Sequence, residues 1–252
     1  MRVPVFSIIT ITYNAAYCLE KTILSILNQS YSHIEYLIID NNSTDGTVDI
    51  IKQYEAGISY WISGPDEGLY DAMNKGLRKA TGDYVWFINA GDLINSEDTV
   101  RQMVSLLAEG DSLPDIIYGD TLLIDEGGRS LGARRLRPPE RLSWKSFRMG
   151  MLVSHQSFIV KRTIAPEFDL QYRYSSDIDW CIRCMKGAES IFNTRMVLSR
   201  FLDGGLSTVR RKASLKERYL IMCKYYGKVT TVVLHGWFAV RFYVAKCIKK
   251  KI

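Results

Sequence analysis

The sequence predicts an α/β protein with a mostly parallel central sheet flanked by helices, a small antiparallel portion and a C-terminal basic amphipathic helix. In the first hundred residues, β-branched apolar runs alternate with segments whose apolar residues recur at helical spacing. After Pro114 the segments become shorter and more exposed in character. With 252 residues, 47% of them hydrophobic, the chain is long enough to bury a sizeable core.

Four pairs of strand and helix account for the first half of the chain. We expect strands at residues 5–12, 36–39, 60–62 and 83–88, and helices at residues 19–27, 48–54, 69–77 and 96–107. Each strand ends in a loop rich in Asp, Asn or Gly. Because parallel strands end at one edge of a sheet, a ligand crevice is expected beyond their carboxyl ends.

The second half is expected to contain shorter elements and a separate tail. The predicted elements are antiparallel strands at residues 116–118, 121–124 and 129–136, a helix at 139–147, a strand at 157–161, a helix at 177–185 and a strand at 191–198. We divide the chain into a domain of residues 1–209, with halves 1–110 and 111–209, and a tail of residues 210–252.

Charge is distributed unevenly along the chain. Residues 1–126 hold 7 Lys and Arg against 19 Asp and Glu, whereas residues 127–252 hold 26 against 8. The acidic half is suited to holding a metal through its carboxylates. The basic half is suited to an anionic partner, such as phosphate groups or an acidic membrane surface. Nucleic acid is not an expected partner, because no recognition motif accompanies the positive charge.

The cysteines favour a reducing cytoplasm. Five of them are scattered along the chain, and no cationic and apolar leader precedes the first strand. Cys181 and Cys184 have the spacing of half a zinc site, but no second pair accompanies them. We therefore expect no zinc site there.

Carboxylates recur at the ends of the predicted parallel strands. Asp40, Asp45, Asp66 and Asp92 lie at or just after strand ends, where side chains project into the crevice. Aspartates in such loops are often turn formers or helix caps. Their recurrence at one edge instead favours a bound metal or polyol.

Three motifs resemble one known family. The segments FSIITITYNA, EYLIIDNNSTDGT and DEGLYDAMNKGLRKATGDYVWFINAGD resemble the inverting glycosyltransferases of family 2, which have the GT-A fold. The match covers nearly all of the first hundred residues in order. The resemblance implies a nucleotide-binding half at residues 1–110 and an acceptor-binding half at residues 111–209.

The resemblance also implies a nucleotide site. Thr12 and Asn14 match positions that line the nucleotide pocket, and Asp40 matches the carboxylate that accepts a hydrogen bond from the base. Asn74 matches a residue of the helix that closes over the nucleotide, although a solvated polar role is the alternative. Asp66 is a further candidate for contact with the substrate.

Asp92 matches the last carboxylate of the family's aspartate-rich motif and is the expected metal ligand. Hard cations such as Mg²⁺ or Mn²⁺ prefer oxygen ligands and are often held by one or two carboxylates plus substrate phosphates. Asn89 and Gly91 stand where aspartates are common in the family. The carboxylate that often contacts the ribose is therefore missing here.

The expected general base lies in the second half. Residues 175–180 resemble the family's Glu-Asp-x-Asp stretch, in which the matching base is Asp177, although both Asp177 and Asp179 also suit a helix N-terminus. Asp179 is a further candidate for substrate contact. His155, in a His-Gln pair found in this branch of the family, is expected either to bind donor phosphate or acceptor or to be structural.

The tail is predicted to form a basic amphipathic helix. Residues 210–252 hold 12 Lys and Arg and one acidic residue. One helical face carries Val229, Val233, Trp237, Val240, Val244 and Ile248, and the opposite face Lys224, Lys228, Thr231, His235, Lys246 and Lys249. Such a helix is expected to lie on an anionic membrane surface, and packing on the protein or spanning the membrane are the alternatives.

The sequence therefore predicts an inverting glycosyltransferase at the cytoplasmic face of a membrane. The expected donor is a nucleotide-diphosphate sugar, with UDP favoured, and the expected acceptor is a lipid-linked glycan in surface polysaccharide synthesis. The alternative is a non-catalytic protein that binds a nucleotide sugar or lipid phosphate.

Overall fold

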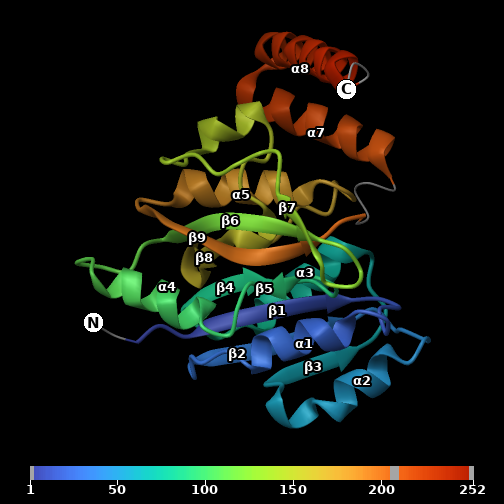
Figure 1. Ribbon diagram of the computed structural model, residues 1–252, viewed down its shortest axis with the longest axis vertical. Coiled ribbons are helices and arrows are strands. Elements are labelled where there is room, and N and C mark those ends of the chain that lie inside the picture. The colour runs from blue at the N-terminus through green and yellow to red at the C-terminus, as the bar shows by residue number, and fades with distance from the viewer. Residues whose placement is uncertain (1–2, 205–209, 250–252) are drawn as a thin grey trace.

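A single sheet forms the centre of the computed structural model, which describes residues 3–204 and 210–249, the last part (239–249) by its backbone alone (Figure 1). The strands are β1 (Phe6–Thr12), β2 (Ile34–Asp40), β3 (Tyr60–Ser63), β4 (Tyr84–Phe87), β5 (Leu93–Ile94), β6 (Ile116–Ile124), β7 (Ser130–Ala133), β8 (Phe158–Lys161) and β9 (Ile191–Leu202). They run in the order β3-β2-β1-β4-β8-β6-β9-β5, and β7 pairs with β6. The two predicted halves of the domain thus share one sheet.

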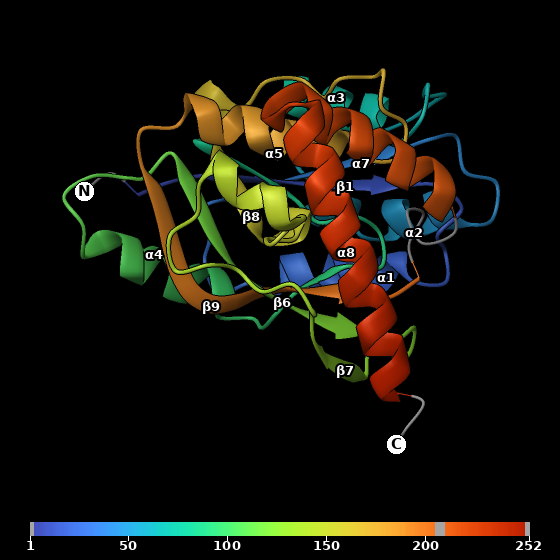
Figure 2. The same ribbon diagram turned by 90° about the horizontal axis from the view of Figure 1, so that it is seen from above.

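Helices cover both faces of this sheet (Figure 2). One face is covered by α1 (Leu19–Leu27), α2 (Thr47–Gln53) and α4 (Thr99–Ala108), and the other by α3 (Leu69–Lys79) and α5 (Ser176–Gly187). Successive side chains of a strand point to opposite faces. Ile8 and Trp86 accordingly pack in the first apolar layer, and Ile9 and Phe87 pack in the second.

The predicted parallel part of the sheet is confirmed. β1 pairs in parallel with β2 and β4, and β2 pairs in parallel with β3. The helix α3 lies so close to β1 that a Cβ atom added at Gly76 would come within 2.5 Å of Ile9 Cγ2. The register brings the ends of β1, β2 and β3, at Thr12, Asp40 and Ser63, to one edge.

The antiparallel portion is confirmed with different boundaries. β8 is antiparallel to β4 and β6, and β7 is antiparallel to β6, whereas β9 runs parallel to β6. The two strands expected at residues 116–124 are one strand, β6, with shifts of register in its pairing with β9. The short strand β5 was not predicted.

The prediction of a helix at residues 139–147 is wrong. Only a 3-10 helix, η2 (Trp144–Met149), forms there, and it begins after a capping box at Ser143. The backbone oxygens of Pro139 and Glu140 accept hydrogen bonds from the Tyr118 hydroxyl, both at 2.9 Å. Since these oxygens would serve the first turn of a helix, tertiary contacts hold this stretch out of a helical conformation. The other 3-10 helices are η1 (Glu55–Gly57), η3 (His155–Ser157) and η4 (Arg162–Ile164).

The tail is two helices instead of the one that we predicted. α7 (Arg211–Tyr226) ends at Gly227, whose φ of 81° favours glycine, and α8 (Lys228–Lys249) follows in a new direction (Figure 1). α7 packs on the domain through the buried Ile221. No helix in the described ranges is both long and apolar enough to cross a membrane.

The predicted apolar face of the tail is exposed where it is described. Val229, Val233 and Trp237 are 80%, 66% and 52% exposed. Thr231 is buried, and the His235 ring lies against Tyr219 of α7. The predicted apolar residues Val240, Val244 and Ile248 lie among the residues described by backbone alone, and the predicted domain boundary at 209 lies outside the described residues.

Candidate active site

The carboxyl edge of the parallel strands holds a fixed carboxylate. Asp40, at the end of β2, is fully buried, and its Oδ2 accepts hydrogen bonds from the Ser43 backbone N–H (2.9 Å) and the Ser63 hydroxyl (2.6 Å). The Ser43 hydroxyl donates to Oδ1. A carboxylate offers about four acceptor positions, so these three bonds leave one on Oδ1 for a ligand.

The loops after β1 and β2 are joined beside that carboxylate. Asn14 adopts a left-handed backbone with φ of 46°, and its side-chain oxygen accepts a hydrogen bond from the Thr44 N–H (2.9 Å). The Asn14 N–H in turn donates to the Ser43 hydroxyl (2.8 Å). Asn can adopt this backbone more readily than most residues. The predicted nucleotide residues Thr12, Asn14 and Asp40 are thus brought together at one place.

Buried oxygens without a partner gather at the same edge. Among the residues that the structure describes, Thr12 Oγ1, Asp66 Oδ2 and Asn89 Oδ1 are buried and accept or donate no hydrogen bond. Asp66 forms an ion pair with Lys75 through its other oxygen. Buried polar atoms in native proteins are normally satisfied. Three unsatisfied oxygens, at the end of β1 and after β3 and β4, therefore indicate that a polar ligand binds this edge.

Asp92 is buried at the far end of the edge. Its two oxygens accept hydrogen bonds from the Gln156 amide (2.8 Å) and the Leu202 N–H (3.1 Å). Burial raises the pKa of Asp92 to about 7, and these two donors oppose the shift. A nearby cation would restore the ionised form of this carboxyl group.

The residues at Asp92 fit a metal that the substrate helps to hold. In the described part of the chain, no three His, Cys, Asp or Glu side chains gather into a metal cluster. The Asp92 N–H bonds to the Asn89 carbonyl (2.9 Å), so the unpartnered Asn89 Oδ1 belongs to the same turn as the Asp92 carboxylate. One carboxylate and one amide oxygen suffice for Mg²⁺ only when waters or phosphates complete its shell.

The candidate base contacts a residue that lines an open cleft. Asp177, in the first turn of α5, accepts a hydrogen bond from the Tyr70 hydroxyl (3.2 Å), and Tyr70 belongs to α3. The cleft has a volume of about 560 Å³, which suits a small ligand or a sugar. Its lining comes from the start of α3 and the segment before α5 and includes Tyr70, Tyr172, Tyr174, Arg173 and Arg210.

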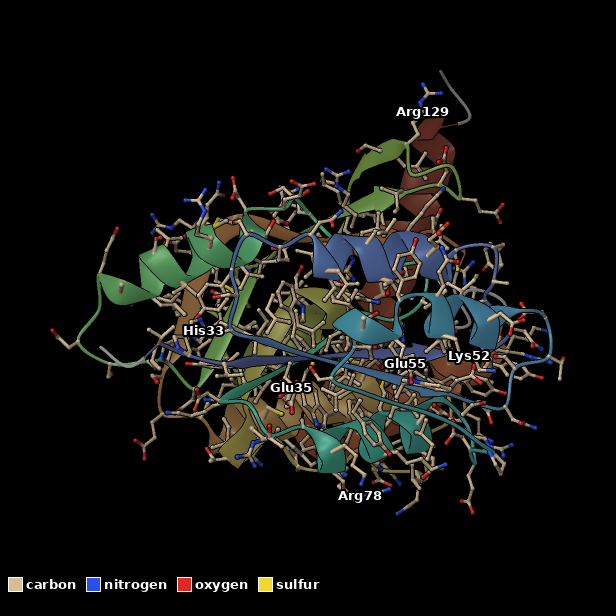
Figure 3. All side chains as sticks on the ribbon, turned by 90° about the horizontal axis from the view of Figure 1, so that it is seen from below. His33, Glu35, Lys52, Glu55, Arg78 and Arg129 are labelled. Carbon is tan, nitrogen blue, oxygen red and sulfur yellow. The ribbon has the colours of Figure 1, made fainter. Side chains whose placement is uncertain are left out.

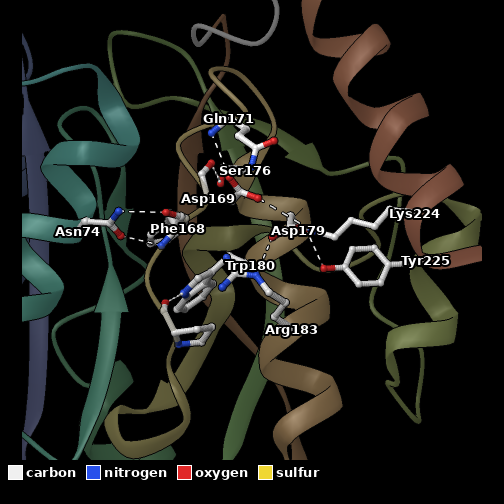
Figure 4. Close-up of polar contacts among 11 residues, drawn as sticks. Asn74, Phe168, Asp169, Gln171, Ser176, Asp179, Trp180, Arg183, Lys224 and Tyr225 are labelled. Carbon is white, nitrogen blue, oxygen red and sulfur yellow. Dashed lines mark hydrogen bonds and ion pairs between the residues drawn. The ribbon is translucent and has the colours of Figure 1, made fainter.

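Asp179 holds α5 against α7 (Figure 4). Its fully buried carboxylate forms ion pairs with Arg183 (2.7 Å) and Lys224 (2.9 Å). It also accepts a hydrogen bond from the Tyr225 hydroxyl (2.8 Å). These three donors from two helices lower its pKa, although burial acts in the opposite direction. The structure brings Asp179 to a contact between helices, and it brings Asp177 to Tyr70, which lines the cleft.

Asn74 and His155 are both buried beside Phe168. The Asn74 side chain donates to the Phe168 carbonyl (3.0 Å) and accepts from its N–H (2.6 Å), as Figure 4 shows. His155 stacks on Phe87 at 5.2 Å, and burial lowers its pKa to about 4. Asn74 therefore fixes the segment before α5, and His155 is a neutral ring whose Nε2 has no partner among the described atoms.

Several residues of the site were not predicted from the sequence. Tyr70 lies within the third motif but was not singled out there, and Tyr172 lies in no motif; their place beside Asp177 or the cleft identifies them. Gln156 and Lys75 adjoin predicted residues, but their contacts with Asp92 and Asp66 depend on the fold. A spacing rule could have found Lys75, because it follows Asp71 by one helical turn.

Comparison with known sequences decides the family. A sequence model of glycosyl transferase family 2 matches residues 7–165. The chain belongs to glycosyltransferase family 2. It is 31% identical over 231 residues to an uncharacterized glycosyltransferase of Mycobacterium tuberculosis, covering 86% of each chain. It is 32% identical over 227 residues to a PGL/p-HBAD biosynthesis glycosyltransferase of Mycobacterium bovis, covering 86% of this family 2 chain and 85% of the relative.

Solved structures confirm the predicted GT-A fold for this family 2 glycosyltransferase. Staphylococcus aureus TarS, in a structure with UDP-GlcNAc, superimposes with a TM-score of 0.70 at 15% identity, covering 91% of this chain and 70% of that chain. Against a longer TarS chain, our chain spans only 43% of the length. The mannosyltransferase PcManGT of Pyrobaculum calidifontis, solved with GDP-Man and Mn²⁺, gives a TM-score of 0.63 at 18% identity, covering 94% and 75%.

Proposed function

We propose that this protein transfers a sugar, with inversion, from a nucleoside diphosphate to a hydroxyl of a lipid-linked glycan. The observation that carries this proposal is the row of unsatisfied buried oxygens along the carboxyl edge of the sheet, together with a cleft whose lining residue Tyr70 contacts Asp177. The edge suits a polar nucleotide sugar, and the cleft suits its acceptor. Family membership supports the reaction class.

The donor half of the site binds the nucleotide in this proposal. The remaining acceptor position on Asp40 Oδ1 receives a ring N–H of the base, and Thr12 and Asn14 line the same pocket. A buried carboxylate rejects a ring that lacks this donor, because the carboxylate is then left unpaired. The UDP-GlcNAc and UDP bound to TarS support a uridine nucleotide as the donor here.

A divalent metal, Mg²⁺ or Mn²⁺, joins the donor at Asp92 in this proposal. The Asp92 carboxylate and the free Asn89 Oδ1 would hold it, and the donor's phosphates would complete its shell. When bound, such an ion stabilises the charge on the departing diphosphate. The Mn²⁺ present in the PcManGT structure supports this assignment.

Asp177 performs the proton transfer in the proposed reaction. Its carboxylate accepts the proton of the acceptor hydroxyl as that oxygen bonds to the anomeric carbon, and the bond from this carbon to the nucleoside diphosphate breaks. The hydrogen bond from Tyr70 orients the carboxylate. Attack opposite the leaving group inverts the configuration of the anomeric carbon.

The exposed face of α8 supports a place on a membrane. Val229, Val233 and Trp237 point to solvent, and the tail around them is strongly basic. We assign this face to the anionic inner surface of the cytoplasmic membrane, where a lipid-linked acceptor is found. The name of the mycobacterial PGL/p-HBAD relative supports a role in glycan or glycolipid synthesis.

Replacement of Asp177 by Asn tests the proposal. The variant should bind the nucleotide sugar with unchanged affinity, because Asp177 lies on the acceptor side, but its turnover should fall by ~10² or more. Calorimetry measures donor binding, and release of nucleoside diphosphate measures turnover, with water as the acceptor if none is known. Asp111→Asn, at an exposed position on another loop, is the matched control and should leave both quantities unchanged.

Two results would contradict the assignment. Equal turnover of the Asp177→Asn variant and the native protein would remove Asp177 from the chemistry. Tight donor binding without any turnover by the native protein, even with a membrane extract as acceptor, would favour the alternative of a non-catalytic nucleotide-sugar binding protein.

A further inference from the structure

The turn that carries Asp92 is fixed mainly through its backbone. The Asp92 carbonyl accepts a hydrogen bond from the Thr22 hydroxyl of α1 (2.9 Å), which in turn accepts the Gly91 N–H (2.9 Å). The Leu202 backbone N–H, at the end of β9, donates to Asp92 Oδ1 (3.1 Å). Among the side chains that the structure describes, the Gln156 amide is the one that donates to this carboxylate, at Oδ2 (2.8 Å). The orientation of the carboxylate therefore depends on Gln156.

Gln156 is itself fixed at its backbone and at its side chain. It is buried just before β8, and the Trp86 indole N–H of β4 donates to its carbonyl oxygen (2.8 Å). The Ser154 hydroxyl donates to the side-chain Oε1 (2.6 Å). An amide carries an acceptor oxygen on one side and donors on the other. Because Ser154 takes the oxygen, the amide N–H is directed at Asp92 Oδ2.

This amide orients Asp92 without cancelling its charge. No cationic side chain in the described part of the chain forms an ion pair with Asp92, and each carboxylate oxygen accepts one hydrogen bond. A carboxylate offers about four acceptor positions, so one remains on each oxygen. A lysine in place of Gln156 would compete with a bound cation, whereas a neutral amide does not. Carboxylates that ligate metals are commonly held by such hydrogen bonds.

We propose that Gln156 is a positioning residue for the divalent metal, and that Ser154 sets the direction of its amide. The inference rests on the proposed function, which places the ion at Asp92. Gln156 does not itself bind the ion in this assignment, because its Nε2 is a donor and its Oε1 is taken by Ser154. Its influence on the nucleotide sugar therefore passes through the Asp92 carboxylate.

The experiment measures the affinity for UDP by calorimetry, once with Mn²⁺ and once with a chelator. Gln156→Leu should weaken UDP binding in Mn²⁺ by about tenfold or more, since loss of a partner of a ligating group typically reduces metal affinity by this factor. With the chelator, the variant and the native protein should bind UDP equally, because the metal no longer contributes. A general loss of structure would lower the affinity under both conditions.

A second variant and two controls accompany this measurement. Ser154→Ala leaves the amide free to rotate and should cause a smaller loss in Mn²⁺ alone, which tests the inference even if Gln156→Leu does not fold. Ser7→Ala removes another buried hydroxyl, one that accepts the Gly82 N–H (2.9 Å) near the opposite end of β1. Gln102→Leu removes an exposed amide on α4. Both controls should leave UDP affinity unchanged in Mn²⁺ and in chelator.

The outcomes separate this inference from the proposed metal. If Mn²⁺ tightens UDP binding equally in the native protein and in folded Gln156→Leu and Ser154→Ala, the metal stands and the role of Gln156 is overturned. Equal losses with Mn²⁺ and with chelator would show a purely structural role and would overturn it as well. Native binding of UDP that does not depend on Mn²⁺ would contradict the metal itself, and the inference would fall with it.

Discussion

At the residue scale, burial sets the protonation of two predicted site residues in opposite directions. Asp92 has its pKa raised to about 7, so it takes up a proton more readily than an exposed aspartate. His155 has its pKa lowered to about 4, mainly by burial, while the nearby Asp177 opposes the shift. His155 is therefore neutral at pH 7, where it packs as an uncharged ring against Phe87.

The lowered pKa of His155 predicts that the protein loses stability in acid. In the unfolded chain this histidine has a pKa near 6.5, so between about pH 6.5 and pH 4 the unfolded state binds more protons than the folded state. Stability should then fall as the pH falls through this window, by about 2 kcal/mol from His155 between pH 7 and pH 4.5. Urea unfolding of the native protein and of His155→Phe at both pH values measures this contribution as a difference.

The control for this prediction is His33→Asn. His33 is exposed before β2 (Figure 3), so this variant should lose as much stability in acid as the native protein. Asp92 contributes in the opposite sense over the same window, but it is present in all three proteins and cancels in the comparison. An acid loss in His155→Phe as large as in the native protein would show that His155 titrates normally.

At the scale of elements, the two tail helices have different roles. α7 belongs to the domain, because its Ile221 is buried in the core and its Lys224 and Tyr225 contact the Asp179 carboxylate of α5 (Figure 4). α8 instead exposes the apolar residues Val229, Val233 and Trp237. Removal of the whole tail would therefore damage the domain, whereas a chain that ends at Gly227 keeps α7.

The exposed face of α8 is predicted to hold the protein on anionic vesicles. Val233→Ser combined with Trp237→Ser should weaken binding to anionic lipid by about tenfold or more, because each apolar side chain loses its burial in the headgroup layer. Salt should weaken the binding of the native protein, since charge attraction is screened within about 8 Å at physiological ionic strength. Co-sedimentation with vesicles across a salt series measures both effects.

A matched control lies at the other end of the molecule. Ile62 is 44% exposed on β3, far from α8 in Figure 1, and Ile62→Ser should leave vesicle binding unchanged. Equal binding of the native protein to neutral and anionic vesicles at every salt concentration would contradict an electrostatic attachment. The same vesicle affinity in the α8 double variant would assign membrane binding to another surface.

At the scale of the whole molecule, the sequence predicted the parallel half of the fold best. Each of these strands is a continuous apolar run that ends in a turn-forming loop, as at Asp40, so local pattern and final structure agree. The helix expected at residues 139–147 failed because Tyr118, which is distant in sequence, takes the backbone oxygens of Pro139 and Glu140. Tertiary contacts of this kind leave no local signal.

The residues of the candidate site also divide into those that the sequence could place and those that only the fold brings together. Residues next to strand ends, such as Thr12 and Asp40, could be placed from the sequence, because parallel strands share an edge. The contact between Tyr70 and Asp177 joins segments that are far apart in the chain. Gly227 likewise divides a tail that reads as one amphipathic helix, and its positive φ is visible only in the structure.

The most direct test of the central claim is a screen of nucleotide sugars for release of free nucleoside diphosphate by the purified full-length protein. We predict slow release from at least one donor, with UDP-sugars first, that requires Mg²⁺ or Mn²⁺, stops with a chelator and falls by ~10² or more in Asp177→Asn. The chelator result tests the metal at Asp92, and the variant tests the base. Failure of the folded protein to bind or hydrolyse any nucleotide sugar with either metal present would contradict the assignment of this site to glycosyl transfer.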